Sequence, residues 1–175
     1  EIHKQMNGKI DFLVSVAGTG GTIGGNSTYL KENVSGCKVV LIDPEGSGIC
    51  SYFHTGEYKS EGRSITEGIG IMRLTANFDK AQVDEAYTLS DQDVVTMAEH
   101  LRRHDGILMG SSAALNVCGA LKVALANGPG KRIVTFYCDL GERSFSKLYN
   151  PEFLKTRDLD SSRTDINELI QKYKS

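Results

Sequence analysis

A glycine-rich run at residues 16–25, VAGTGGTIGG, constrains the fold of this chain more than any other stretch. It follows the apolar residues 10–16, which are typical of a buried strand, and precedes residues 25–33, which are typical of a helix. A glycine-rich turn between a strand and a helix leaves backbone N–H groups available at the helix N-terminus, and such groups bind anions. Thr19 and Thr22 add hydroxyl donors. The run therefore predicts a phosphate-binding loop.

Strand-like and helix-like segments alternate along the rest of the chain. Short apolar runs predict strands at residues 38–43, 107–109 and 132–138, and helical spacing predicts helices at 91–105, 112–126 and 142–149. The apolar residues of 46–67 show no regular spacing, and this segment is interpreted as a long excursion from the sheet. This alternation predicts an α/β fold of three α-β-α layers around a mostly parallel sheet. The segments that follow the strands are expected to share one edge of that sheet.

Composition and charge exclude several classes of function. The chain has 175 residues, of which 39% are hydrophobic, and its net charge is −2, so it has no basic excess for nucleic acid. It contains no apolar stretch near the roughly 20 residues that a membrane span needs. The four cysteines form no pair with metal-ligand spacing, which indicates reduced thiols and no metal site. We expect a cytoplasmic protein, with mitochondria as the alternative because a targeting segment would precede Glu1.

The chain is divided into an α/β domain at residues 1–155 and a polar tail at 156–175. The tail carries an apolar stripe at helical spacing after Ser162, which is a candidate N-cap, and this pattern predicts a short amphipathic helix. The stripe consists of Ile166, Leu169, Ile170 and Tyr173. The tail carries no recognisable chemistry.

The glycine run leaves several phosphate ligands open. A dinucleotide-binding fingerprint needs glycine at its sixth position, where this chain has Ile23. Asp43 nevertheless ends the next predicted strand, so a nicotinamide-binding domain remains an alternative. A P-loop is excluded because no Gly-Lys-Ser/Thr follows. A turn of purely structural importance is the remaining alternative.

Gly18-Thr19-Gly20-Gly21-Thr22 resembles the phosphate cup of the fold-type II pyridoxal 5′-phosphate enzymes, whose fold is like that of the tryptophan synthase β subunit. Within that group the chain is most similar to cysteine synthase, in its eukaryotic form, and to cystathionine β-synthase. The resemblance covers about residues 9–153 in the family's order, including residues 40–47 (VLIDPEGS), 67–70 (EGIG), 108–112 (LMGSS), 128–135 (GPGKRIVT) and 138–143 (CDLGER).

The resemblance implies a site for pyridoxal 5′-phosphate. Gly18, Thr19, Gly20, Gly21 and Thr22 would bind its phosphate. By the same match, the Ser112 hydroxyl would meet the pyridine nitrogen and leave it largely unprotonated, although the family's glycine two residues later is Ala114 here. Gly68 and Ile69 would lie near the amine and carboxylate of the substrate. Cys138 is interpreted as a packing residue.

The resemblance also implies a β-replacement reaction, in which an O-acetylserine-type substrate forms an aminoacrylate to which sulfide or a thiol adds, giving L-cysteine or a relative. In the family the Schiff-base lysine lies upstream of the phosphate cup, whereas here only Lys4 and Lys9 precede Gly18, in a different context. We therefore expect the C-terminal half of a homodimeric enzyme, with no catalytic residue of its own and no activity alone. A non-catalytic phosphate-binding or regulatory module is the alternative.

Overall fold

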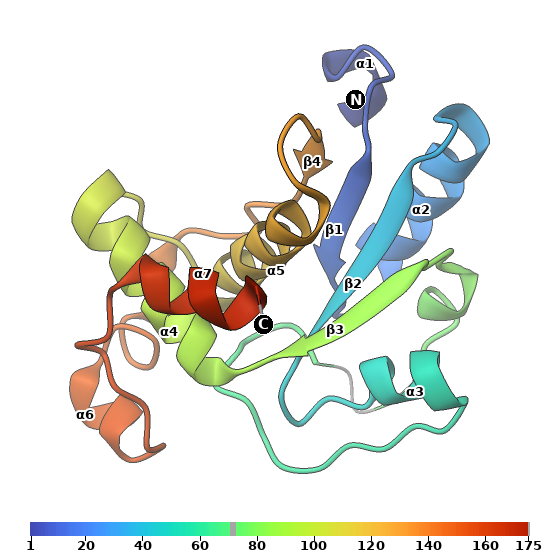
Figure 1. The fold of residues 1–175 in the computed structure, drawn as a ribbon. Helices are drawn as coiled ribbons and strands as arrows, with labels where there is room; N and C mark the ends of the chain where they lie inside the picture. The colour runs from blue at the N-terminus through green and yellow to red at the C-terminus, as the bar shows by residue number, and fades with distance from the viewer. Residues whose placement is uncertain (71–72, 175) are drawn as a thin grey trace.

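The computed structural model describes residues 1–70 and 73–174. Its centre is a four-stranded sheet in the order β3-β2-β1-β4, with every neighbouring pair parallel (Figure 1). The strands are β1 (Phe12–Val16), β2 (Lys38–Pro44), β3 (Glu85–Leu89) and β4 (Ile133–Val134). The predicted α/β class and its parallel sheet are thus confirmed.

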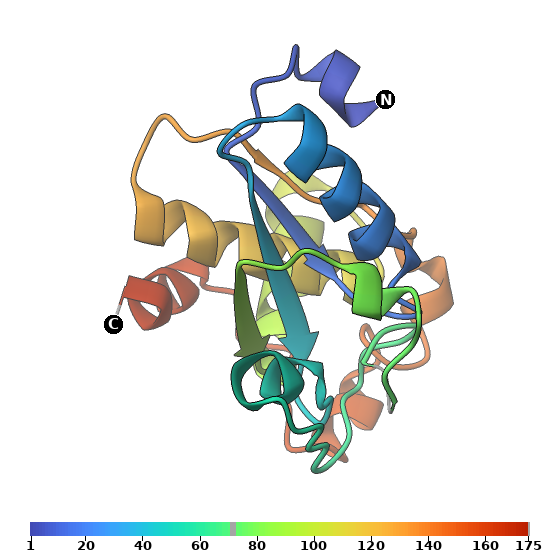
Figure 2. The same cartoon turned by 90° about the vertical axis from the view of Figure 1, so that its right-hand side faces the viewer.

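Helices cover both faces of the sheet and complete the three layers (Figures 1 and 2). Alternate residues of β1 face opposite sides: Val14 packs in the cluster that contains α5, and Leu13 packs in the cluster that contains α2. One face carries α1 (Ile2–Gln5), α2 (Gly21–Asn33) and α3 (Ile49–Thr55), and the other carries α4 (Asp91–His100), α5 (Ser111–Asn127) and α7 (Ile166–Lys174).

The close packing of α5 on the sheet depends on a glycine. A Cβ atom at Gly119 would lie 2.3 Å from Cγ1 of Ile42 in β2, so a side chain there would push the helix away. The apolar face of α5 can therefore approach the sheet, and its N-terminus lies beside the carboxyl end of β1.

Several local predictions were wrong. The excursion at 46–67, for which no helix was predicted, contains α3. The strand β3 was not predicted either, because it is a half-exposed strand of five residues at the sheet edge. Residues 107–109 contribute only an isolated bridge from Met109 to Leu140. Residues 142–149 contain a single 3-10 turn, Gly141–Ser144, and further 3-10 and π turns occur at Phe78–Lys80 and Leu101–Asp105.

The polar tail also differs in detail from the prediction. Leu169 and Tyr173 of the predicted stripe are buried, and α7 packs against α4 and α5. Asp165 caps the helix by accepting a hydrogen bond of 2.9 Å from the Asn167 N–H, so the predicted cap at Ser162 is wrong. Asp93 in α4 is only 2% exposed, and its carboxylate accepts from Lys172 Nζ at 2.7 Å. The tail helix is thus bound by apolar and charged contacts together.

The short helix α6 (Pro151–Lys155) begins directly after Asn150. Asn150 Oδ1 accepts hydrogen bonds from the N–H groups of Glu152 and Phe153, and Pro151 occupies the first turn, where its missing N–H costs nothing. No helix within the described residues has the length and apolar character that crossing a membrane requires.

Candidate functional site

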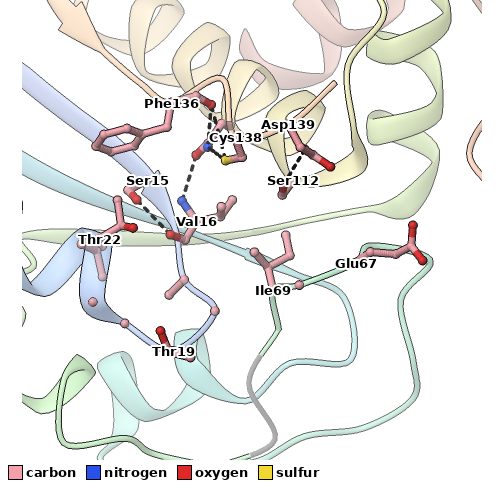
Figure 3. Close-up of a pocket in the computed structure, with 17 residues that line it drawn as sticks. Ser15, Val16, Thr19, Thr22, Glu67, Ile69, Ser112, Phe136, Cys138 and Asp139 are labelled. Atoms are coloured by element: carbon pink, nitrogen blue, oxygen red, sulfur yellow. Dashed lines mark hydrogen bonds between the residues drawn. The ribbon is translucent and has the colours of Figure 1, made fainter. Parts of the chain in front are cut away.

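A cavity of about 340 Å³ lies at the carboxyl end of β1, as expected for an open parallel sheet (Figure 3). Its walls come from three parts of the chain: the glycine loop after β1, residues 67–69, and the start of α5 with residues 136–139. Every predicted site residue lines this cavity, namely Gly18, Thr19, Gly20, Gly21, Thr22, Gly68, Ile69 and Ser112.

The glycine loop forms the first wall and requires glycine for two reasons. Gly20 has a φ of +82°, which side chains rarely adopt, and a Cβ there would lie 2.6 Å from the Phe78 nitrogen. A Cβ at Gly18 would lie 2.3 Å from the Gly68 carbonyl oxygen, so the loop touches the second wall directly. The first two walls of the cavity are therefore in contact at Gly18 and Gly68.

The helix that follows this loop begins without a cap from the described side chains. Gly20 is the N-cap of α2 and supplies no side-chain hydrogen bond, so the first N–H groups of the helix remain available to a ligand. The same holds for α5, which begins after Gly110. By contrast, Ser90 caps α4 away from the cavity by accepting from the Asp93 N–H at 3.3 Å. Two uncapped helix N-termini therefore border the cavity.

The wall at the start of α5 presents a hydroxyl. Ser112 is only 7% exposed, and its Oγ donates to Asp139 Oδ1 at 3.3 Å. The chain around Asp139 is tied to the segment before α5, because the Gly110 N–H donates to the Asp139 carbonyl at 3.1 Å. The hydroxyl and the carboxylate therefore face the same side of the cavity (Figure 3).

Asn116 lies between the end of β1 and the segment after β4, and it lines the cavity. Its Oδ1 accepts from the Val16 N–H at 2.9 Å, and its Nδ2 donates to the Phe136 carbonyl at 3.0 Å. The amide thus occupies the place of a ladder hydrogen bond between the ends of β1 and the segment after β4. This explains why β4 stops at Val134, although the sequence predicted a strand to Cys138.

The wall formed by residues 67–69 is anchored by side chains from two helices. The Glu67 N–H donates to Ser111 Oγ at 2.9 Å, and the Ile65 N–H donates to the Asp91 carboxylate at 2.8 Å. Burial raises the pKa of Asp91, and the hydroxyl of Ser64 opposes that shift by donating to the same carboxylate. Glu67 also pairs with Lys147 across 2.6 Å.

Sequence reasoning missed Ser111, Asn116 and Asp139. The signal for Asn116 was its polarity within an otherwise apolar helix, because a buried amide normally has hydrogen-bonding partners. Asp139 lies in a segment that the resemblance included, without a role. The packing interpretation of Cys138 was wrong, because the residue is exposed and lines the cavity.

Asp43 does not line the cavity, although it is the last residue but one of β2, the strand beside β1. Its carboxylate is fully buried and accepts from the Cys50 N–H at 2.9 Å at the start of α3, and burial raises its pKa. An acid held in this way is not available to a ribose hydroxyl, which weakens the nicotinamide alternative. Within the described residues no group of three or more metal-ligating side chains occurs.

The walls fit a monophosphate joined to a small aromatic ring. The first wall offers helix N–H groups and the hydroxyls of Thr19 and Thr22, all suited to an anion, while the opposite wall offers the Ser112 hydroxyl. The volume lies at the lower end of the range for small-ligand sites, about 300–1,000 Å³. The sequence model of the family described as "Pyridoxal-phosphate dependent enzyme" matches residues 1–139, which include all of these walls.

The chain belongs to this family. It is 43% identical over 172 residues to cysteine synthase 2 of Schizosaccharomyces pombe, covering 91% of this chain and 44% of that protein. It is 42% identical over 179 residues to the cysteine synthase of Dictyostelium discoideum, covering 97% of this chain and 47% of that protein. The chain thus spans about half the length of the curated relatives it matches.

A solved structure agrees with the family assignment. The O-acetylserine dependent cystathionine beta-synthase from Helicobacter pylori superposes with a TM-score of 0.74 at 28% identity, over 83% of this chain and 45% of that chain. The fold-type II architecture expected from the resemblance is therefore confirmed. Pyridoxal phosphate is the cofactor of the family.

Proposed function

We propose that this chain is the cofactor-binding part of a β-replacement enzyme that makes L-cysteine or a relative from an O-acetylserine-type substrate and sulfide or a thiol. The observation that carries the proposal is the position of the glycine loop and Ser112 on facing walls of one cavity. The match to cysteine synthases over nearly the whole chain supports the reaction class. We include a homodimeric assembly and a cytoplasmic or mitochondrial location as parts of this proposal.

The residues of the cavity divide into three roles under this proposal. The N–H groups of Gly20, Gly21 and Thr22 and the hydroxyls of Thr19 and Thr22 hold the phosphate. Helix N–H groups are suited to this because they bind a dianion without a lysine or arginine. Ser112 contacts the ring nitrogen. Gly68 and Ile69 contact the substrate amine and carboxylate.

Bound pyridoxal phosphate supplies an electron sink for bonds at the α-carbon of an amino acid substrate. The described residues that line the cavity include no lysine, so the amine that this chemistry needs must come from outside these walls. Residues 67–69 and 136–139 shape the cavity around the substrate, and the polar Glu67–Lys147 pair lies beside it. The chain alone is therefore expected to bind and orient the ligand without turnover.

Binding of pyridoxine 5′-phosphate, which has no aldehyde to react with surface lysines, tests the site. We expect calorimetry to detect this ligand but neither NADH nor unphosphorylated pyridoxine, and we expect Gly20→Ala to remove the binding. Gly25→Ala is the matched control, because a Cβ at Gly25 has nothing within 4 Å. Equal binding of pyridoxine, or tighter binding of NADH, would contradict the proposal.

The described residues that line the cavity include no lysine, which also favours a second candidate, a non-catalytic phosphate-binding module. The reading frame upstream of Glu1 separates the two. An upstream lysine in a Ser-x-Lys context, together with cysteine formation from O-acetylserine and sulfide by the longer protein, supports the enzyme. A longer protein that binds the cofactor and forms no cysteine supports the module.

A further inference from the structure

We propose that Thr75 is a positioning residue for the phosphate, because its hydroxyl holds the peptide unit between Thr19 and Gly20 in the orientation that turns the Gly20 N–H toward the cavity. The inference rests on the proposed function, which supplies the phosphate. Thr75 is half-buried and does not line the cavity, and its Oγ1 donates to the Thr19 carbonyl at 2.7 Å. Thr75 therefore acts on the glycine loop from the side away from the cavity.

The single proton of the Thr75 hydroxyl is fixed on this contact. The Phe78 N–H donates to Thr75 Oγ1 at 3.2 Å, so the hydroxyl oxygen already accepts a hydrogen bond. A carbonyl oxygen can only accept, so the hydroxyl is the donor toward Thr19. The hydroxyl thus links the backbone of Phe78 to the backbone of the loop, which an apolar side chain of the same size cannot do.

The segment that carries Thr75 is packed against the loop at two further points. A Cβ atom at Gly20 would lie 2.6 Å from the Phe78 nitrogen, and one at Gly24 would lie 2.5 Å from the Asn77 carbonyl oxygen. The Phe78 side chain is only 7% exposed and belongs to the apolar cluster on the same face of the sheet as α2. Residues 75–78 therefore form a fixed support for the loop.

The geometry of the peptide unit gives this support its consequence. A trans peptide is planar, with its C=O and N–H pointing in opposite directions. Because the Thr19 carbonyl points to Thr75, the Gly20 N–H points the other way, and Gly20 lines the cavity (Figure 3). Among the residues that the structure describes, none accepts a hydrogen bond from this N–H. It is therefore available to a phosphate oxygen, beside the N–H groups at the start of α2.

Gly20 makes such an anchor necessary. Glycine adopts positive and negative φ about equally well, so its own backbone does little to prevent the Thr19–Gly20 peptide from turning over. A turned peptide would present the Thr19 carbonyl oxygen to the cavity, and that oxygen repels an anion. The Thr75 hydroxyl opposes this turn because the turn would break its bond to Thr19.

Calorimetry with pyridoxine 5′-phosphate tests the hydroxyl. Thr75→Val removes it and nearly keeps the shape of the side chain, whereas Thr75→Ser retains it. We expect the affinity to fall by about three- to tenfold in Thr75→Val and to stay within about twofold in Thr75→Ser, as for the loss or retention of one hydrogen bond. Thr55→Val in α3 is the matched control, because Thr55 Oγ1 also donates to a backbone carbonyl, at 2.8 Å, and accepts from a backbone N–H, at 3.2 Å, away from the cavity.

The amide resonance of Gly20 separates positioning from a general loss of stability. In the wild type and in Thr75→Ser, we expect the Gly20 amide proton to move downfield when pyridoxine 5′-phosphate is added, as a proton hydrogen-bonded to an anion does. In Thr75→Val, this movement should be much smaller at saturating ligand. An unchanged affinity in Thr75→Val, equal losses in Thr75→Val and Thr75→Ser, or a Gly20 resonance that moves as far in Thr75→Val as in the wild type each overturns the inference.

Two results keep the inference testable when a variant does not fold. Thr75→Ala removes the hydroxyl without a second methyl group in its place and carries the same expectations as Thr75→Val. A wild-type Gly20 resonance that does not move on binding overturns the inference without any variant, while the binding itself still supports the proposed function. Failure of the wild-type chain to bind pyridoxine 5′-phosphate overturns the proposed function and the inference with it. Far-UV circular dichroism confirms that each variant is folded.

Discussion

Substitution of Asn116 by alanine is expected to destabilise the chain strongly. Asn116 is fully buried and bridges the Val16 N–H and the Phe136 carbonyl. Each buried polar group left without a partner costs about 1–3 kcal/mol. Val16 is only 6% exposed, so the loss of a partner for its N–H should cost the full amount. Phe136 is half-buried and lines the cavity, so water can replace the lost partner of its carbonyl. We therefore expect a loss of about 2–4 kcal/mol in the free energy of unfolding.

Urea unfolding followed by circular dichroism measures this loss. With a slope of about 2 kcal/mol per molar urea, the midpoint should fall by about 1–2 M. The control is Asn127→Ala in the same helix, where the exposed amide donates only to the Val123 carbonyl and the change should stay within about 0.5 kcal/mol. If Asn116→Ala costs no more than Asn127→Ala, the bridging role is refuted.

A second variant tests the hydrogen bond that Asn116 Nδ2 donates to the Phe136 carbonyl. Asn116→Asp retains an acceptor for the Val16 N–H but places a buried carboxylate against the Phe136 carbonyl oxygen. Burial raises the pKa of such a carboxyl in the folded state, so the variant should regain stability relative to wild type as the pH falls through that raised pKa. A pH-independent difference would contradict the argument.

Three further outcomes follow from the packing. Gly20→Ala should lower the free energy of unfolding by at least about 1–2 kcal/mol in urea titrations because of its left-handed backbone, whereas Gly25→Ala within α2 should be neutral or stabilising by up to about 1 kcal/mol. The raised pKa of Asp43 means that the folded state binds its proton more readily than the unfolded state, whose pKa is near 3.8. The stability of wild type relative to Asp43→Asn should therefore rise as the pH falls from neutral through that raised pKa. Unfolding midpoints measured at stepped pH check this, and a flat or opposite trend would contradict it. Leu169→Ala should cost about 2–5 kcal/mol by the same unfolding assay, because this side chain is buried against the domain; a cost under 1 kcal/mol would support a tail that is independent of residues 1–155.

Local signals were enough to predict much of the fold. β1 and β2 are mostly apolar runs, α4 begins where the predicted helix at 91–105 begins, and the glycine run produces the loop at Gly20. The resemblance placed Ser112 in the same cavity as that loop. These features depend on neighbours within one turn or strand, or on motifs in a fixed order, so a single sequence reveals them.

Contacts between distant residues could not be predicted in this way. The bond from Val16 to Asn116 joins residues 100 positions apart, and it ends β4 early despite an apolar sequence that continues to Cys138. β3 lies at the sheet edge with a half-exposed face, so its sequence lacks a continuous apolar run. The pairing of Ser112 with Asp139 likewise requires the bridge between Met109 and Leu140.

The uncapped start of α2 at the cavity has an evolutionary consequence. The attraction for an anion there comes from peptide dipoles, which every amino acid sequence shares as long as α2 begins where it does. This attraction does not depend on a charged side chain, whereas one methyl group at Gly18 or Gly20 can block the approach of an anion. As sequences of this kind diverge, the preference for a phosphate should therefore outlast the substrate specificity, which depends on replaceable side chains.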